Sequence, residues 1–212
     1  MGVWTRNYYN LLTAALLCDD TGSSSATPSD YTPPIRVRRY NGAYASAGAN
    51  NGLQGVSIEY ALPYILPPFT KGGAYSQARL ITSANPELSI TYAFGIAVGN
   101  GSTPATYEDY NMGSYITSGL TLANGWGSLA QASTYNSENH HITSKRSYTI
   151  TNSSSSSIPV SEVGIFVHYA QNNYSATTMI YHDVFDTIIL EPGESLILTF
   201  ERDAEVFNYT PY

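Results

Sequence analysis

The sequence predicts an all-β protein: a β-sandwich or jelly-roll-like domain with a short N-terminal helix and an extended arm. Three observations support this. From residue 56 onward, short runs rich in Ile, Val, Thr, Tyr and Phe recur, turn-forming Gly, Pro, Asn and Ser separate them, and no convincing helical pattern lies between them. We therefore divide the 212 residues into 1–55, the helix and arm, and 56–212, the β-sandwich domain.

The helix is expected over residues 5–19. Its apolar side chains share one stripe at helical spacing: Tyr8, Leu11, Leu12, Ala15 and Leu16. Residues 21–34 are typical of a linker, and 36–55 contain four glycines and neither a helical nor a strand period. Because such an arm buries little apolar surface by itself, we expect it to lie along something else.

Eight strands are expected in the second part of the chain. They cover residues 56–60, 78–83, 88–98, 115–122, 146–152, 160–168, 177–185 and 195–201. Three turn signals separate some of them: the hairpin-type dipeptide Asn124-Gly125, a flexible connection at 153–157, and Pro192-Gly193. Within one loop, Thr106 and Asp109 have the spacing of a helix cap, which predicts at most two helical turns there.

The strands near the C-terminus are apolar on both faces. Strict alternation places Val163, Ile165 and Val167 opposite Phe166 and His168, and places Ile180, His182 and Val184 opposite Met179, Tyr181 and Phe185. A sheet of this kind is covered on both sides, so we expect another subunit to supply the second cover.

The composition excludes several classes. The hydrophobic share of 42% is too high for a disordered chain, and no stretch approaches the roughly 20 apolar residues of a membrane span. The single cysteine excludes a disulfide scaffold. We expect Cys18 to be a buried small hydrophobe and the N-terminus to be unprocessed, because residues 11–18 lack the features of a signal sequence.

Charge is scarce and unevenly distributed. Only 12% of residues are charged, whereas an ordinary soluble domain has roughly 25%. Residues 1–106 sum to +1 and residues 107–212 to −8. The acidic half repels phosphate backbones, so nucleic acid is not an expected partner. The short basic cluster Arg36, Arg38 and Arg39 is expected to form ion pairs with a neighbouring acidic surface.

Tyrosine is abundant. The chain has 19, together with many Ser, Thr, Asn and Gly residues. This mixture is typical of surfaces that are buried against other proteins or sugars, and it also fits the preference of tyrosine for strands.

No constellation of residues predicts catalysis, a metal or a cofactor. Adjacent His140 and His141 point to opposite faces of a strand, and His168 and His182 could meet across the sheet but lack identifiable further ligands. The paired acids have simpler explanations than the facing carboxylates of a glycosidase. Glu108-Asp109 fits the charge preference of a helix N-terminus, and Glu191 with Glu194 fits a solvated turn. We therefore expect a protein that is not an enzyme.

Three segments carry a resemblance to a known class of protein. They are residues 98–104 (VGNGSTP) running into 107–110 (YEDY), residues 148–152 (YTITN) with 153–157 and 160–166 (VSEVGIF), and residues 182–184 (HDV) leading to 190–196 (LEPGESL). In this order they resemble virion structural proteins of tailed bacteriophages, and the opening residues 4–10 (WTRNYYN) are similar to the start of such chains. The resemblance implies β-rich modules located in the virion and brings no catalytic residue.

The resemblance and the composition together predict a non-enzymatic structural component of a phage particle. We expect a capsid decoration, cement or head-fibre-base protein that forms a homo-oligomer and binds other virion proteins. A tail or baseplate protein remains an alternative, as does a carbohydrate-binding host-attachment module in which a ring such as that of Trp126 stacks on a host glycan. The expected interface residues lie in the helix and the arm: Tyr8, Leu12, Leu16, Arg36, Arg38, Arg39 and Tyr40.

Overall fold

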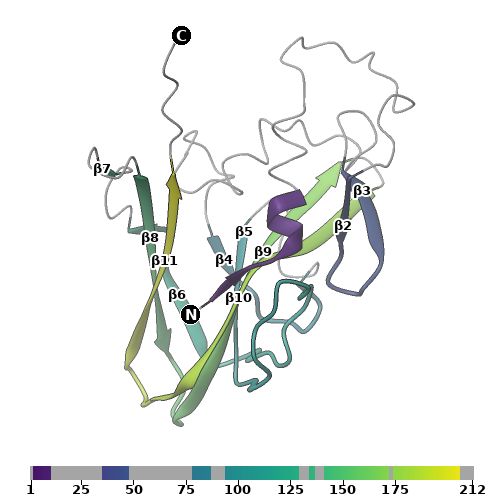
Figure 1. Ribbon diagram of the computed structural model, residues 1–212. Helices are drawn as coiled ribbons and strands as arrows, with labels where there is room; N and C mark the ends of the chain where they lie inside the picture. Colours follow the sequence, from purple (N-terminus) through teal and green to yellow (C-terminus); the bar gives the residue numbers. More distant parts are fainter. Residues whose placement is uncertain are drawn as a thin grey trace.

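The structure, a computed structural model, describes residues 2–10, 35–47, 78–86, 94–128, 134–136, 141–171 and 174–205. Strands dominate it (Figure 1), and the all-β prediction is confirmed. The strands are β1 (Val3–Trp4), β2 (Ile35–Arg38), β3 (Tyr44–Ala47), β4 (Ala78–Leu80), β5 (Phe94–Gly99), β6 (Leu120–Ser128), β7 (Thr134–Asn136), β8 (His141–Asn152), β9 (Ile158–Gln171), β10 (Tyr174–Leu190) and β11 (Ser195–Glu205). Within the described ranges, no helix is long and apolar enough to cross a membrane.

Two sheets form the body of the protein. The first has the order β1-β10-β9-β5-β4, with β4 and β5 parallel and the other neighbours antiparallel. The second has the order β11-β8-β6, and β7 also pairs with β8. Side chains of both sheets join one buried cluster, which includes Ile96 and Ile165 of the first sheet and Ile150 and Leu198 of the second. The two sheets therefore pack face to face as a sandwich.

The sequence of β11 shows how this sandwich is encoded. Leu198 and Phe200 are buried, whereas Ile197 and Thr199 are exposed. Because successive side chains of a strand point to opposite faces, this alternation turns one face of the sheet inward and leaves the other outside.

The far face of the first sheet is covered by the chain itself. Phe166 and Met179 are fully buried there, together with Met112, and Tyr40 and Tyr115 pack against them. These covering residues come from the loop between β5 and β6 and from the turn after β2. The expectation that another subunit covers this face is therefore wrong at these positions.

A bulge in β10 changes which residues share a face. Met179 pairs with Phe166, but Tyr181 pairs with Ile165, so Ile180 is an extra residue. Ile180 and Tyr181 consequently both contact the central core, and His182 returns to the far face with Met179. The predicted grouping of Ile180 with His182, opposite Tyr181, is wrong because strict alternation takes no account of a bulge.

Two of the three predicted connections are found. Pro192-Gly193 lies between β10 and β11, where Gly193 adopts a φ of 84°. Residues 153–157 join β8 to β9. The side-chain amide of Asn152 fixes this connection, because its Nδ2 donates to the backbone carbonyls of Ser156 and Leu190, both at 2.8 Å. Asn124-Gly125 does not form a hairpin turn, because it lies inside β6, where the register with β8 is irregular.

The described parts of residues 1–55 pack on the same chain's sheets. β1 pairs with β10, residues 6–10 form a short helix, and Tyr8 is 1% exposed in the central core. β2 and β3 form a hairpin, where we expected an extended arm, and the amide of Tyr40 donates to the carbonyl of Thr177 (3.0 Å). The side chain of Asn7 ties the two parts together, because it bonds the backbone of both Arg38 and Met179. Predicted elements at 11–19, 21–34, 48–55 and 56–60 lie outside the described residues.

Two of the expected strands have different outcomes. Of the 88–98 run, residues 94–98 belong to β5, and 87–93 lie outside the described residues. The 115–122 run becomes a strand only at Leu120. Residues 115–119 instead belong to the loop that covers the far face of the first sheet.

Candidate functional site

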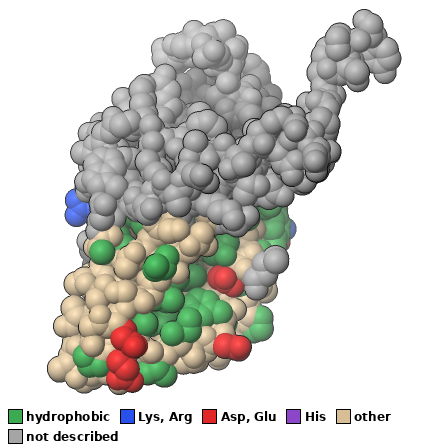
Figure 2. Space-filling view, turned by 90° about the vertical axis from the view of Figure 1, so that its left-hand side faces the viewer, with side chains coloured by type: hydrophobic (Ala, Val, Ile, Leu, Met, Phe, Trp, Pro, Cys, Tyr) green, Lys and Arg blue, Asp and Glu red, His purple; other side chains and the backbone are tan. Residues whose placement is uncertain are grey.

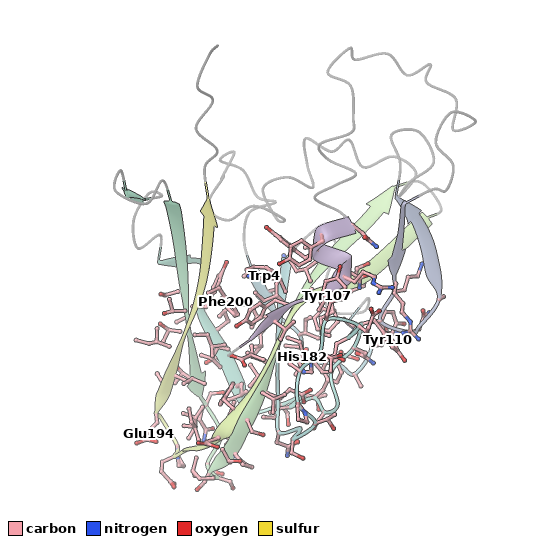
Figure 3. The ribbon with its side chains drawn as sticks, viewed as in Figure 1. Trp4, Tyr107, Tyr110, His182, Glu194 and Phe200 are labelled. Carbon is pink, nitrogen blue, oxygen red and sulfur yellow. The ribbon has the colours of Figure 1, made fainter. Side chains whose placement is uncertain are left out.

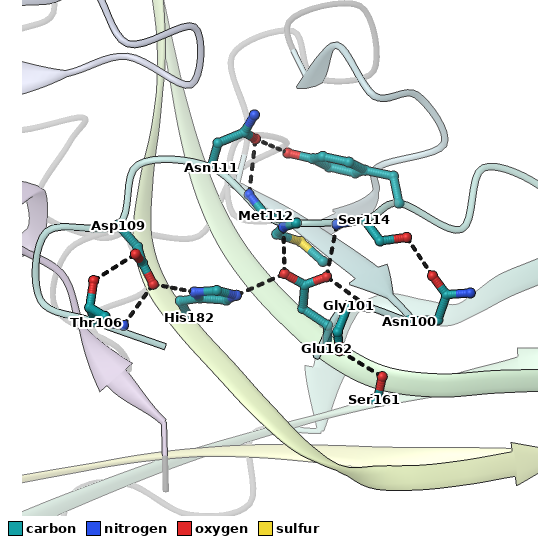
Figure 4. A network of polar contacts seen from close by, with 12 residues as sticks. Asn100, Gly101, Thr106, Asp109, Asn111, Met112, Ser114, Ser161, Glu162 and His182 are labelled. Atoms are coloured by element: carbon teal, nitrogen blue, oxygen red, sulfur yellow. Dashed lines mark hydrogen bonds and ion pairs between the residues drawn. The ribbon is translucent and has the colours of Figure 1, made fainter. Parts of the chain in front are cut away.

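A buried carboxylate organises the loop between β5 and β6. Glu162 lies on β9 and is only 1% exposed. Its Oε1 accepts the backbone N–H of Gly113 at 2.7 Å, and its Oε2 accepts those of Ser114 at 3.0 Å and Gly101 at 3.1 Å (Figure 4). An ionised carboxylate is costly to bury unless donors of this kind surround it. Glu162 therefore holds the loop against β9 at two places, Gly101 and Gly113–Ser114.

His182 lies beside Glu162 on the neighbouring strand. Its Cα pairs with that of Gly164 on β9, and its side chain is buried. Nε2 is 2.9 Å from Glu162 Oε1, and Nδ1 is 2.6 Å from Asp109 Oδ2. The imidazole thus bridges two carboxylates, and Figure 3 shows it between the strands and the loop that carries Tyr107 and Tyr110.

Asp109 is held by the residue three positions before it. Its Oδ2 accepts the backbone N–H of Thr106 at 2.7 Å, and its Oδ1 accepts the Thr106 hydroxyl at 2.6 Å. The predicted contact between these residues is present, but a turn follows and not a helix. The Asp109 carboxylate forms a hydrogen bond with His182 as well, so it anchors the turn to the sheet.

The three charges of this network support one another. Burial raises the pKa of Glu162, but hydrogen bonds from His182 and the Gly113 amide outweigh it and hold the pKa below its usual value. For Asp109, burial is likewise outweighed by the Thr106 hydrogen bonds and by His182, so its pKa is also lowered. Burial lowers the pKa of His182, but the bonds with Glu162 and Asp109 outweigh it and raise the pKa. Only an imidazolium can donate to both ionised carboxylates, so the site favours the charged form of all three groups.

Glycines allow the loop to approach this closely. A Cβ on Gly101 would lie 2.2 Å from Glu162 Oε2, and one on Gly99 would lie 2.4 Å from the Ser114 carbonyl oxygen. On β9, a Cβ on Gly164 would lie 2.7 Å from the sulfur of Met112. The loop can close on the sheet only because these side chains are absent.

The network of Glu162, His182 and Asp109 fixes the loop between β5 and β6 to the first sheet. Both oxygens of Glu162 and both ring nitrogens of His182 are engaged within the protein. The two carboxylates lie on opposite sides of the ring, so they do not converge on one ion. In the part of the chain that the structure describes, no three His, Cys, Asp or Glu residues are arranged to hold a metal.

The expected interface residues have different positions. Tyr8 is buried in the central core and Tyr40 packs on the far face, while the guanidinium of Arg38 lies 3.7 Å above the ring of Tyr110. Leu12, Leu16 and the side chain of Arg36 lie outside the described residues. Arg39 is partly buried, and its backbone N–H donates to the carbonyl of Ala43 (2.7 Å). The interface role of this set stays a prediction.

His168 lies apart from the His182 network. His168 pairs with Thr177 and His182 with Gly164, so the two histidines do not meet across the sheet. The His140 and His141 side chains are outside the described part.

The two pairs of acids have different explanations. Glu108 forms an ion pair with Arg6, so the helix-terminus explanation of Glu108-Asp109 is wrong. At Glu191 and Glu194 the turn explanation is confirmed, because the Glu194 carboxylate accepts the Glu191 amide at 2.9 Å on an exposed turn.

The sequence predicted no role for Glu162. The available signal is its place in the strand run 160–166, where it is the only charge among apolar residues. A charge in such a position requires a partner. His182 also lies within an apolar run, and this position marks it as a candidate partner for Glu162.

No known protein family, curated protein or solved structure matches this chain in the comparisons.

Proposed function

We propose that this protein is a non-enzymatic structural component of a bacteriophage particle, and that it acts as a capsid decoration, cement or head-fibre-base protein. The observation that carries the proposal concerns the segments that resemble phage virion proteins. The glycine-rich loop with Asp109, the strand with Glu162, and the strand with His182 are far apart in sequence, but they meet in one buried network. The resemblance therefore falls on residues that depend on one another in the fold.

The chemistry of the network agrees with a structural role. Its charged atoms bond to backbone amides and to each other, and this arrangement stabilises a loop. A protein that must stay folded outside a cell, without disulfides, gains from such long-range ties between strands and loops. A tail or baseplate location remains the alternative within the same class.

The test is the protein content of purified particles. Particles of the phage whose genome encodes this chain are purified on a density gradient and quantified by mass spectrometry. We expect the chain in the particles, and a copy number on the order of hundreds indicates the head, whereas about six or twelve indicates the tail. If infected cells make the chain but purified particles lack it, the proposal is wrong.

A carbohydrate-binding module is the second candidate, and one observation favours it. Tyr9 and Tyr107 are 45% and 42% exposed, with ring centroids 5.9 Å apart, and Arg6 lies 5.4 Å from the centroid of the Tyr107 ring. Exposed aromatic rings beside a charged pair can stack on and hydrogen-bond a sugar. The side chain of Trp126, the residue expected from the sequence, is outside the described part.

Saturable binding of the purified chain on a glycan array, lost in Tyr107→Ala, would favour this second candidate. Binding that Tyr107→Ala leaves unchanged would place any sugar elsewhere. No binding by the intact chain would leave the virion role as the better explanation of the abundant tyrosines.

A further inference from the structure

The turn of residues 106–110 connects the buried network to the outer surface. Its Asp109 carboxylate lies against the buried ring of His182, with Oδ2 2.6 Å from Nδ1. Its Tyr107 side chain is 42% exposed, and the Tyr107 carbonyl accepts the backbone N–H of Arg6 at 2.7 Å. The turn therefore has one contact with the network and another with the N-terminal segment.

His182 can hold both carboxylates only while its ring is charged. The imidazolium has two N–H groups, whereas the neutral ring has one donor and one acceptor. In the neutral ring, one nitrogen would present its lone pair to a carboxylate oxygen, at 2.6 Å from Asp109 or at 2.9 Å from Glu162 (Figure 4). Two acceptors at such a distance repel each other, so one of the two contacts must break when the ring loses a proton.

The contact with Asp109 is the one that breaks at lower cost. Glu162 is 1% exposed and three backbone amides fix it, so water cannot replace a donor that it loses. The Asp109 side chain is 23% exposed, so water can hydrate its carboxylate when it moves away. The remaining ring proton therefore stays on Nε2, toward Glu162, and the acceptor Nδ1 faces Asp109.

The two carboxylates are the charges that act on the ring. Besides burial, Glu162 and Asp109 are the causes that shift the pKa of His182, and together they raise it. Nearby described groups have partners of their own: Asp183 with Tyr181, Arg6 with Glu108, Tyr115 with Asn111, and Arg38 with the Tyr110 ring. Figure 2 shows Asp and Glu side chains on the described surface of one face, with Lys or Arg only at its edges. Together with the net charge of −7, this field also favours the charged ring.

We propose that the 106–110 turn is held on the sheet while His182 is charged, and that it detaches when a rise in pH removes a proton from the ring. Detachment separates the Tyr107 ring from that of Tyr9, 5.9 Å away between centroids, and breaks the bond from the Arg6 amide. The exposed pair Tyr9 and Tyr107 then forms one surface only below the His182 midpoint. The proposal depends on neither the virion role nor a bound glycan.

The test is amide hydrogen exchange of the full chain, followed by NMR together with the ring titration of His182. Rates are corrected for the intrinsic pH dependence of exchange. We expect the protection of the Arg6 amide to fall at least about tenfold across the His182 midpoint. The reason is that a midpoint difference of one pH unit between the attached and detached states changes the attachment equilibrium tenfold. The Gly113 and Ser114 amides, which Glu162 holds, should keep their protection.

Two variants show which carboxylate is responsible. Asp109→Asn removes the charge that faces Nδ1, so the fall in Arg6 protection should disappear and the ring midpoint should decrease. Asp183→Asn is the matched control, because Asp183 is the next residue in the chain but bonds with Tyr181 on the opposite face of β10. It should keep the fall. Circular dichroism checks that each variant is folded.

Constant protection of the Arg6 amide through the ring titration overturns the proposal, and so does a ring that stays charged until the protein unfolds. The ring nitrogen shifts above the midpoint should show the proton on Nε2. A proton on Nδ1, or a fall that persists in Asp109→Asn, shows that the Asp109 contact does not break and also overturns it. Neither virions nor glycans enter these measurements, so failure here and failure of the proposed function are separate results.

Discussion

His182 Nε2 lies 2.9 Å from Glu162 Oε1, and both side chains are almost fully buried between two neighbouring strands and a loop. The Cα atom of His182 on β10 pairs with that of Gly164 on β9, two residues after Glu162. The side chains of Glu162 and His182 therefore lie on the same face of the sheet. This relationship joins the sheet to the loop, since Glu162 also accepts three backbone amides from it. The loop in turn covers the far face of the first sheet through Met112 and Tyr115.

Glu162→Gln is expected to destabilise the protein strongly. The neutral amide keeps the shape, but it cannot accept from all three loop amides as the carboxylate does, and it leaves His182 without one charged partner. Breaking a buried charged pair from one side costs about 3–5 kcal/mol in the free energy of unfolding, as measured by urea denaturation. Glu191→Gln, on the exposed turn, is the control and should change it by less than about 0.5 kcal/mol. Equal effects of both substitutions would contradict the account.

The stability contributed by His182 is expected to depend on pH. The pKa of His182 is raised in the folded protein, so its contribution is fully present below its unfolded pKa of about 6.5 and is lost as the pH rises through the folded value. The pKa values of Asp109 and Glu162 are lowered, so their contribution is present above the unfolded values of about 4 and is lost as the pH falls through the folded values.

The network should therefore stabilise the protein most at about pH 5–6. The measurement is the difference in unfolding free energy between the wild type and His182→Gln as a function of pH. It should be largest in that window and should shrink on both sides. A difference that is constant from acid to alkaline pH would show that the charges do not matter.

Gly101→Ala is expected to disturb the network by steric contact. The added Cβ would overlap Glu162 Oε2, so either the carboxylate or the loop must move. Gly193→Ala is a useful comparison, because Gly193 has a positive φ of 84° but nothing within 4 Å of an added Cβ. The Gly193 variant should lose about 1 kcal/mol through backbone strain and keep the pH dependence of the wild type. The Gly101 variant should lose more and show a weaker pH dependence, as followed by thermal unfolding.

Tyr8→Ala is expected to cost about 3–5 kcal/mol, because it removes a fully buried aromatic side chain from the core. Its ring lies 4.5 Å from that of Trp4, which in turn lies 5.1 Å from the ring of Tyr181, with Phe200 beyond (Figure 3). Tyr9→Ala, at an exposed neighbouring position, should cost far less. If the two substitutions have equal effects on the urea midpoint, the N-terminal segment is not part of the core.

Much of the sandwich follows from patterns within single strands. Alternation correctly predicts that Val163, Ile165 and Val167 share the core face, and Pro192-Gly193 correctly predicts a turn. Asn124-Gly125 shows the limit of this reasoning, because the pairing of β6 with β8 overrides a local turn preference. The bulge at Ile180 is a further limit, since nothing in the local pattern marks the extra residue.

The site was harder to predict than the fold because its contacts are long-range. Gly101 and Glu162 are 61 residues apart, and His182 and Asp109 are 73 apart. Each residue alone has an ordinary local explanation, such as a turn glycine or an acid beside a cap. Only the pairing of the strands brings them together, and no single segment of the sequence determines which strands pair.

The most direct test of the network of Glu162, His182 and Asp109 is the protonation state of His182, measured by the nitrogen chemical shifts of its ring in a pH titration. If the ring bridges two ionised carboxylates, the imidazolium form persists to higher pH than in a free histidine, and the titration midpoint lies above the usual value of about 6.5. Glu162→Gln should move that midpoint down in any variant that remains folded. A midpoint at or below about 6.5 would contradict the account.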